Sequence, residues 1–92
     1  GMGTLTELAV LGKPALVIPM PGSHQEQNAI FFERHGAIEI AHQEHLTPQK
    51  FTSIVQALVQ DTDKQKMLQR NLFELMRPHV ATTMAHEVLS LV

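Results

Sequence analysis

The chain has 92 residues, of which 43% are hydrophobic, and this is enough for one small domain with one core. Seven basic and nine acidic residues give a formal net charge of −2, which excludes the strong positive field of a nucleic-acid-binding domain. The chain has no cysteine, which excludes disulfides, thiol catalysis and thiolate zinc sites. No apolar run approaches the roughly 18 residues of a membrane-spanning helix, and no basic start leads into an apolar stretch. These features fit a soluble, cytoplasmic domain.

The first predicted element is a helix over residues 4–11. Its opening sequence, Thr-Leu-Thr-Glu, fits a capping box in which Thr4 is the N-cap and Glu7 the third helical residue. Gly12 is expected to end this helix, because Pro14 prevents its continuation.

Two short strands and a second helix follow. The apolar run at residues 15–18 is typical of a strand that is buried on both faces in a parallel sheet. A second capping box at residues 23–26 opens a helix to about His35, with Gly36 after its end. Residues 37–40 predict a second strand, which is parallel to the first because a helix connects them. Two strands leave apolar edges unpaired, so we expect a piece of a larger α/β sheet, or a sheet completed by another copy.

Three more helices are predicted in the remaining half of the chain. The pair Thr47-Pro48 opens the first of them, and residues 62–65 open the next. Pro78 is expected to break that helix, and residues 81–92 form the last one. The apolar residues expected to face inward are Phe51, Ile54, Val55 and Leu58, then Leu68, Leu72, Leu75 and Met76, and finally Met84, Ala85, Val88 and Leu89.

The first candidate site is the glycine-containing start of the first helix, at residues 1–4. Glycines allow a ligand to approach the backbone, and the free N–H groups and the dipole of a helix start favour an anion such as a diphosphate. The same residues also fit an ordinary capped helix start. Glu7 has two possible functions: it completes the cap, or its carboxylate accepts the two hydroxyls of a ribose.

The second candidate site covers residues 19–28, directly after the first strand. Open α/β sheets bind ligands at the carboxyl ends of their strands. His24 and Gln25 lie in the first turn of the following helix, and imidazole and amide groups suit the hydroxyls of a neutral sugar. Asn28 can hold the loop together from inside. The alternative is a polar loop that only caps a helix.

A metal site is not expected, although the chain has six histidines. His42 and His45 are three residues apart and have Glu39 and Glu44 nearby, but no His-Glu-x-x-His motif is present. The pair Phe31-Phe32 and the methionines are expected to belong to the core.

Taken together, these motifs resemble a known family. The order is Gly-x-x-Thr-x-x-Glu, Gly-Lys-Pro-Ala, an apolar strand, Pro, and His-Gln-x-x-Asn-Ala, and it covers residues 1–36. It resembles the C-terminal domain of GT-B glycosyltransferases, and within them the MurG-type N-acetylglucosaminyltransferases of peptidoglycan synthesis. The resemblance implies a Rossmann-like domain, so residues 1–92 would form one partial domain. An N-terminal domain that holds the acceptor and meets the membrane would be absent.

The resemblance also implies an activity. An inverting, metal-independent transferase without a cofactor would move N-acetylglucosamine from UDP-N-acetylglucosamine to lipid I and form lipid II. The full-length enzyme would act peripherally on the cytoplasmic face of the bacterial membrane. No catalytic residue is expected in this chain, which alone would be inactive. The donor-binding residues implied are Met2, Gly3 and Thr4 at the diphosphate, Glu7 at the ribose, His24 and Gln25 at the sugar, and Asn28 in support of the loop.

Two other classes of function remain open at this stage. The chain can be half of a split transferase, or part of a GT-B transferase with another sugar or lipid acceptor. It can also be a non-catalytic α/β domain that forms homo-oligomers through its sheet edge, in which case the motifs are only helix caps.

Overall fold

The structure is a computed structural model that describes the backbone of residues 2–90 and the side chains of residues 4–78. Helices and strands alternate in the first half of the chain and helices follow, which confirms the predicted α/β class. Gly1, from the first candidate site, lies outside the described residues. The elements are α1 (Met2–Leu11), β1 (Leu16–Val17), α2 (His24–Arg34), β2 (Glu39–Ile40), α3 (Pro48–Gln60) and α4 (Thr62–Ser90).

The two strands form the predicted parallel sheet, with Leu16–Val17 opposite Glu39–Ile40. Each strand has two residues and is shorter than the sequence predicts. At the end of β1 the reason is Pro19, because residues 15, 17 and 19 direct their backbone groups to β2 and proline has no N–H to donate to a sheet.

The start of α1 differs from the prediction. The helix begins at Met2, so Thr4 is inside it and its predicted role as the N-cap is wrong. Among the described side chains, no hydrogen bond of a capping box joins Thr4 to Glu7. Neither Met2 nor Gly3 prevents the helical conformation as proline would, so the helix extends backward past the capping signal.

The ends of α1 and α2 follow the prediction. Gly12 and Gly36 have φ values of 66° and 65°, a left-handed conformation that glycine adopts without strain. After Gly12, the N–H of Lys13 donates to the carbonyl of Leu8 at 3.0 Å, and the same arrangement follows Gly36. This hydrogen bond is typical of a helix that ends at glycine, and it turns the chain directly into the next strand.

The starts of α2 and α3 also follow the prediction. Ser23 and Thr47 have extended backbones, and their hydroxyls accept hydrogen bonds from the N–H groups of Glu26 at 3.2 Å and Lys50 at 3.1 Å. The two helices therefore begin where the sequence places them.

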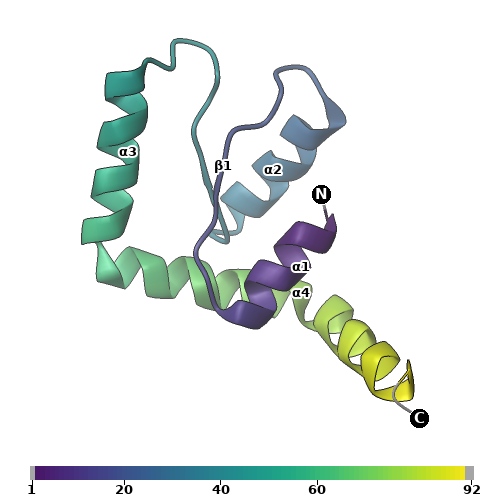
Figure 1. Cartoon of the computed structure of the whole chain (residues 1–92). Coiled ribbons are helices and arrows are strands. Elements are labelled where there is room, and N and C mark those ends of the chain that lie inside the picture. Colours follow the sequence, from purple (N-terminus) through teal and green to yellow (C-terminus); the bar gives the residue numbers. More distant parts are fainter. Residues whose placement is uncertain (1, 91–92) are drawn as a thin grey trace.

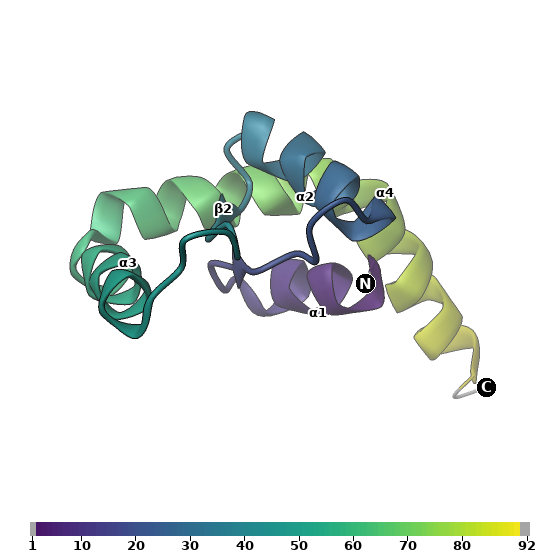
Figure 2. The same ribbon diagram turned by 90° about the horizontal axis from the view of Figure 1, so that it is seen from above.

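The predicted break in the C-terminal helix is wrong. α4 begins at Thr62 as expected, but it continues through Pro78 as one helix to Ser90. Proline removes one backbone hydrogen bond and bends a helix without always ending it. Figures 1 and 2 show the C-terminal part of α4 turning away from the rest of the molecule. The inward face predicted for residues 81–92 falls on side chains outside the described residues.

The core lies where α1, α2 and the sheet meet α4. α4 runs across α1, and α2 packs against β2 (Figure 1; Figure 2). The predicted stripe of α4 is confirmed, because Leu68, Leu72 and Met76 are buried. The buried core residues are Ala9, Ala15, Ala29, Phe32, Ala37, Ile38, Ile40, Leu72 and Met76.

Some residues expected in the core are exposed. Phe31 is 51% exposed and packs edge-to-face on the buried Phe32, with ring centroids 5.5 Å apart. Met20 is also exposed, because it lies in the turn after β1. The apolar face of α3 is partly covered by α4, and none of the residues from Pro48 to Gln60 is buried.

Candidate functional site

A cavity of about 520 Å³ lies between α1 and α2, over β1. Its volume is within the range of small-molecule sites in proteins. The chain from Pro14 to Pro19 forms one wall, and the two helices form the others. The lining is mostly apolar, and its residues are Thr4, Leu5, Leu8, Pro14, Ala15, Leu16, Val17, Ile18, Pro19, Gln25, Asn28, Ala29, Phe32 and Ile38.

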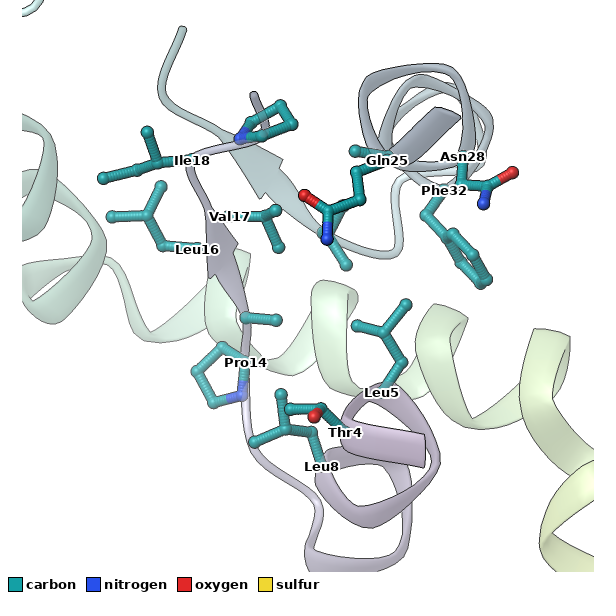
Figure 3. A pocket seen from close by; sticks show the side chains of 14 residues that line it. Thr4, Leu5, Leu8, Pro14, Leu16, Val17, Ile18, Gln25, Asn28 and Phe32 are labelled. Atoms are coloured by element: carbon teal, nitrogen blue, oxygen red, sulfur yellow. The ribbon is translucent and has the colours of Figure 1, made fainter. Parts of the chain in front are cut away.

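The cavity brings together the two candidate sites that the sequence indicates. Thr4 comes from the first site, and Gln25 and Asn28 come from the second. Figure 3 shows the carboxamide of Gln25 extending toward β1, whereas the amide of Asn28 points away from β1 in this view. A hydroxyl and two amides provide hydrogen-bond donors and acceptors without charge, which suits a neutral ligand rich in hydroxyls.

The N-terminal ends of α1 and α2 lie on the same side of the molecule in Figures 1 and 2. Met2 and Gly3 form the start of α1, and His24 and Gln25 form the start of α2. The first N–H groups of a helix have no partner within the helix, and the helix dipole makes this end partly positive. Two such ends beside one cavity can hold an anionic group next to the neutral polar side chains.

Two predicted site residues are exposed and do not line the cavity. Glu7 lies one turn after Thr4 on α1 and directly before Leu8, which does line the cavity. On a helix, residues three apart share a side, so Glu7 lies on the side of α1 that carries Thr4, but its side chain is not part of the lining. His24 precedes Gln25 at the start of α2, and its side chain is open to solvent. The structure thus brings Thr4, Gln25 and Asn28 to one cavity, whereas Glu7 and His24 are exposed and outside its lining.

The apolar part of the lining was not among the predicted site residues. Leu5 and Leu8 face the cavity from α1, and Val17 and Phe32 face it from β1 and α2. One signal in the sequence points to the α1 pair. Leu5 and Leu8 are three residues apart, so they share a helix face, and Leu8 is four residues after Thr4.

The described residues contain no group of three or more His, Asp or Glu side chains placed to hold a metal ion. His42 and His45 are exposed in the loop after β2. The side chains of His79 and His86 lie outside the described residues. Within the part of the chain that the structure describes, the helices lack the combination of length and hydrophobicity needed to cross a membrane.

Comparison with known proteins gives one family and a consistent group of relatives. Residues 1–84 match the family described as "Glycosyltransferase family 28 C-terminal domain". A protein of Christiangramia forsetii is 32% identical over 95 aligned positions, and one of Nostoc punctiforme is 37% identical over 95. Both carry the name UDP-N-acetylglucosamine--N-acetylmuramyl-(pentapeptide) pyrophosphoryl-undecaprenol N-acetylglucosamine transferase.

The alignments with these two relatives cover the whole of this chain but only part of each relative. The alignments include 100% of the chain, 26% of the Christiangramia protein and 27% of the Nostoc protein. The chain therefore spans about a quarter of the length of these curated relatives. No solved structure gives a significant match to the chain.

Proposed function

The chain belongs to the family of the glycosyltransferase family 28 C-terminal domain, and on this basis we propose that it forms the donor-binding part of a glycosyltransferase. The proposed donor is UDP-N-acetylglucosamine, and the proposed acceptor is lipid I, which would be converted to lipid II. The names of the relatives support this assignment. The whole enzyme would act as a peripheral protein on the cytoplasmic face of the membrane, where a lipid-linked acceptor is accessible.

The observation that carries the proposal is the cavity between the two helix starts. A nucleotide sugar joins a doubly anionic diphosphate to a neutral sugar rich in hydroxyls. The N-terminal end of α1 suits the diphosphate, and the uncharged groups of Thr4 and Gln25 at the cavity suit neutral hydroxyls. The residues proposed to bind the donor are Met2, Gly3 and Thr4 at the diphosphate, Glu7 at the ribose, His24 and Gln25 at the sugar, and Asn28 in support of the loop.

The proposed chemistry is an inverting transfer without a metal. A hydroxyl of the acceptor attacks the anomeric carbon, and the bond from this carbon to the UDP phosphate oxygen breaks. Negative charge grows on the departing UDP, and fixed N–H groups at a helix start stabilise that charge without reorganising. We assign the general base and the acceptor surface to a part of the enzyme outside this chain, so the chain alone is expected to bind donor without catalysing transfer.

A titration of the ¹⁵N-labelled chain tests the proposal. UDP-N-acetylglucosamine is expected to shift the backbone amide signals of Thr4, Gln25 and Asn28, whereas Lys50 and Thr52 on α3 serve as controls and keep their signals. Shifts confined to α3 and α4, or no shifts at millimolar donor, would contradict a donor site. Equal affinity for UDP-glucose and UDP-N-acetylglucosamine would favour a GT-B transferase of different sugar specificity.

Among the described residues, β1 pairs with a strand on one edge only, and its other edge favours a second candidate, which is binding of a partner chain. The carbonyl of Ala15 accepts a hydrogen bond from the N–H of Glu39 at 3.0 Å, and that of Val17 accepts one from the N–H of Ala41, directly after β2, at 2.9 Å. Alternate residues of a strand direct their backbone groups to opposite edges, so Leu16 and Ile18 direct theirs away from β2. An unpaired edge is a template for another strand, supplied by the other half of a split transferase or by a second copy.

Mass measurement over a range of concentrations separates these cases. If light scattering gives the monomer mass at every chain concentration from about 10 µM to about 1 mM, binding of a second copy is rejected. A dimer that dissociates when Leu16→Pro removes a backbone donor from the free edge would support it, with Leu16→Ala, which keeps that donor, as the control.

A further inference from the structure

The turn between β1 and α2 is closed by hydrogen bonds from two side chains. The carbonyl of Met20 accepts hydrogen bonds from the N–H of Ser23 at 3.3 Å and from its hydroxyl at 2.5 Å. The same hydroxyl accepts the N–H of Glu26 at 3.2 Å. Oε1 of Glu26 in turn accepts the N–H of Gly22 at 3.1 Å. Ser23 and Glu26 therefore hold the turn Met20–Ser23 against the first turn of α2, and we call these contacts the loop clasp.

The loop clasp reaches further than an ordinary capping box. In a capping box, the glutamate accepts the backbone N–H of the N-cap residue itself. Here the N–H of Ser23 is already bonded to Met20, and Glu26 accepts the N–H of the preceding residue, Gly22. Gly22 has a φ of 72°, a left-handed conformation that other residues adopt only with strain. Glu26 thus restrains the loop as well as the helix start.

The two residues of the loop clasp flank the predicted sugar-binding pair in the sequence. His24 and Gln25 lie between Ser23 and Glu26 in the chain, and the carboxamide of Gln25 extends toward β1 across the cavity (Figure 3). Met20 and Gly22 are exposed, so no core packing holds the turn in place. Ala29, one turn after Gln25, is buried in the core and fixes the body of α2, whereas the turn before Gln25 is held by the hydrogen bonds of the clasp.

We propose that Ser23 and Glu26 are positioning residues that fix Gln25 for contact with the sugar of the donor. The proposal rests on the proposed function, because it presumes that Gln25 meets a nucleotide sugar. Without Glu26, the turn would sample several conformations, and donor binding would have to order it at an entropic cost. This cost lowers the affinity for a ligand that contacts Gln25. It does not lower the affinity for a ligand that binds only through its diphosphate at α1.

Three variants of the chain test the proposal. Glu26→Ala removes the acceptor, Glu26→Gln keeps a side-chain oxygen of the same reach, and Glu33→Ala is a control on the exposed face of the same helix. We expect Glu26→Ala to speed amide hydrogen exchange at Gly22 roughly tenfold and to weaken binding of UDP-N-acetylglucosamine roughly fivefold. Affinity for UDP without the sugar is expected to change less than about twofold, and Glu26→Gln is expected to restore both properties.

The outcomes distinguish a failed clasp from a failed donor site. Faster exchange at Gly22 with unchanged affinity for UDP-N-acetylglucosamine would show a structural role only and overturn the proposal. Equal weakening for UDP and for the sugar nucleotide would also overturn it, because the effect would not act through Gln25. If the wild-type chain binds no UDP-N-acetylglucosamine, the proposed function fails and the positioning role fails with it. The exchange of Gly22 would still report whether the clasp exists.

Discussion

The side-chain amide of Asn71 on α4 donates a hydrogen bond of 3.1 Å to the backbone carbonyl of Gly36 at the end of α2. The two residues are 35 positions apart, so this bond ties the end of α2 to the middle of α4. A Cβ atom added at Gly36 would lie 2.9 Å from Nδ2 of Asn71, closer than such atoms normally approach. An alanine at position 36 would therefore strain the left-handed backbone and force the amide of Asn71 to shift.

We expect Gly36→Ala to destabilise the chain by about 2 kcal/mol, the sum of backbone strain and the contact with Asn71. In an Asn71→Ala background the cost of Gly36→Ala should be smaller, because the contact is gone and only the strain remains. Gly12→Ala is the matched control, since Gly12 has a φ of 66° and no neighbouring atom within 4 Å. Urea unfolding measures the three costs, and an equal cost of Gly36→Ala in both backgrounds would disprove the steric part.

A second prediction concerns the ion pair between Lys64 on α4 and Glu39 on β2. Nζ of Lys64 lies 2.8 Å from Oε1 of Glu39, whereas Oε2 is buried and has no hydrogen-bond partner among the described side chains. We expect Lys64→Met to lower the free energy of unfolding by about 1–2 kcal/mol, because the partly buried carboxylate loses its partner. Arg77→Met is the control, since its ion pair with Glu74 is more exposed, and it should cost less than about 0.5 kcal/mol. Similar costs for the two variants in urea unfolding would contradict this account.

A third prediction compares two glutamines on α2. Gln25 lines the cavity, whereas Gln27 is exposed and does not. Gln25→Ala is expected to weaken binding of UDP-N-acetylglucosamine roughly three- to tenfold, the value of about one hydrogen bond. Gln27→Ala should leave the affinity unchanged. Isothermal titration calorimetry of the two variants measures the difference, and equal affinities would remove Gln25 from the proposed site.

A fourth prediction concerns Pro78 in the interior of α4. Pro78→Ala restores a backbone N–H that can bond to the carbonyl of Glu74 one turn earlier, and proline in a helix interior costs about 3 kcal/mol relative to alanine. We expect a higher melting temperature and more helical signal in far-ultraviolet circular dichroism. Arg77→Ala adds no backbone donor and should change neither. An unchanged melting temperature in Pro78→Ala would show that the C-terminal part of α4 does not contribute to global stability.

Local sequence signals predicted the starts and ends of helices well where neighbouring residues determine the conformation. Ser23 and Thr47 cap their helices, and Gly12 and Gly36 end theirs, because each of these effects acts within one turn of the residue that causes it. The prediction of Thr4 as an N-cap was wrong, because the helix begins two residues earlier, at Met2. A capping signal competes with extension of the helix, and the residues before Thr4 permit extension.

The site was only partly predictable, because a cavity depends on how elements pack. The motifs indicated Thr4, Gln25 and Asn28, which the structure brings to one cavity. They gave no reason to select Phe32 as lining, because an aromatic residue on a helix face is expected in the core whether or not it borders a cavity. The roles of Glu7 and His24 stay predictions, because their side chains lie outside the lining and depend on how a ligand is seated.

The partial covering of α3 has a consequence for how the chain melts. None of the residues from Pro48 to Gln60 is buried, and the main packing partner of α3 is α4. Because so little of its surface is buried, α3 is stabilised only weakly by packing. We therefore expect it to separate from α4 at a lower temperature than the one at which the sheet and α2 unfold. Heating would then give a calorimetric enthalpy larger than the van't Hoff value, the mark of a transition with more than two populated states.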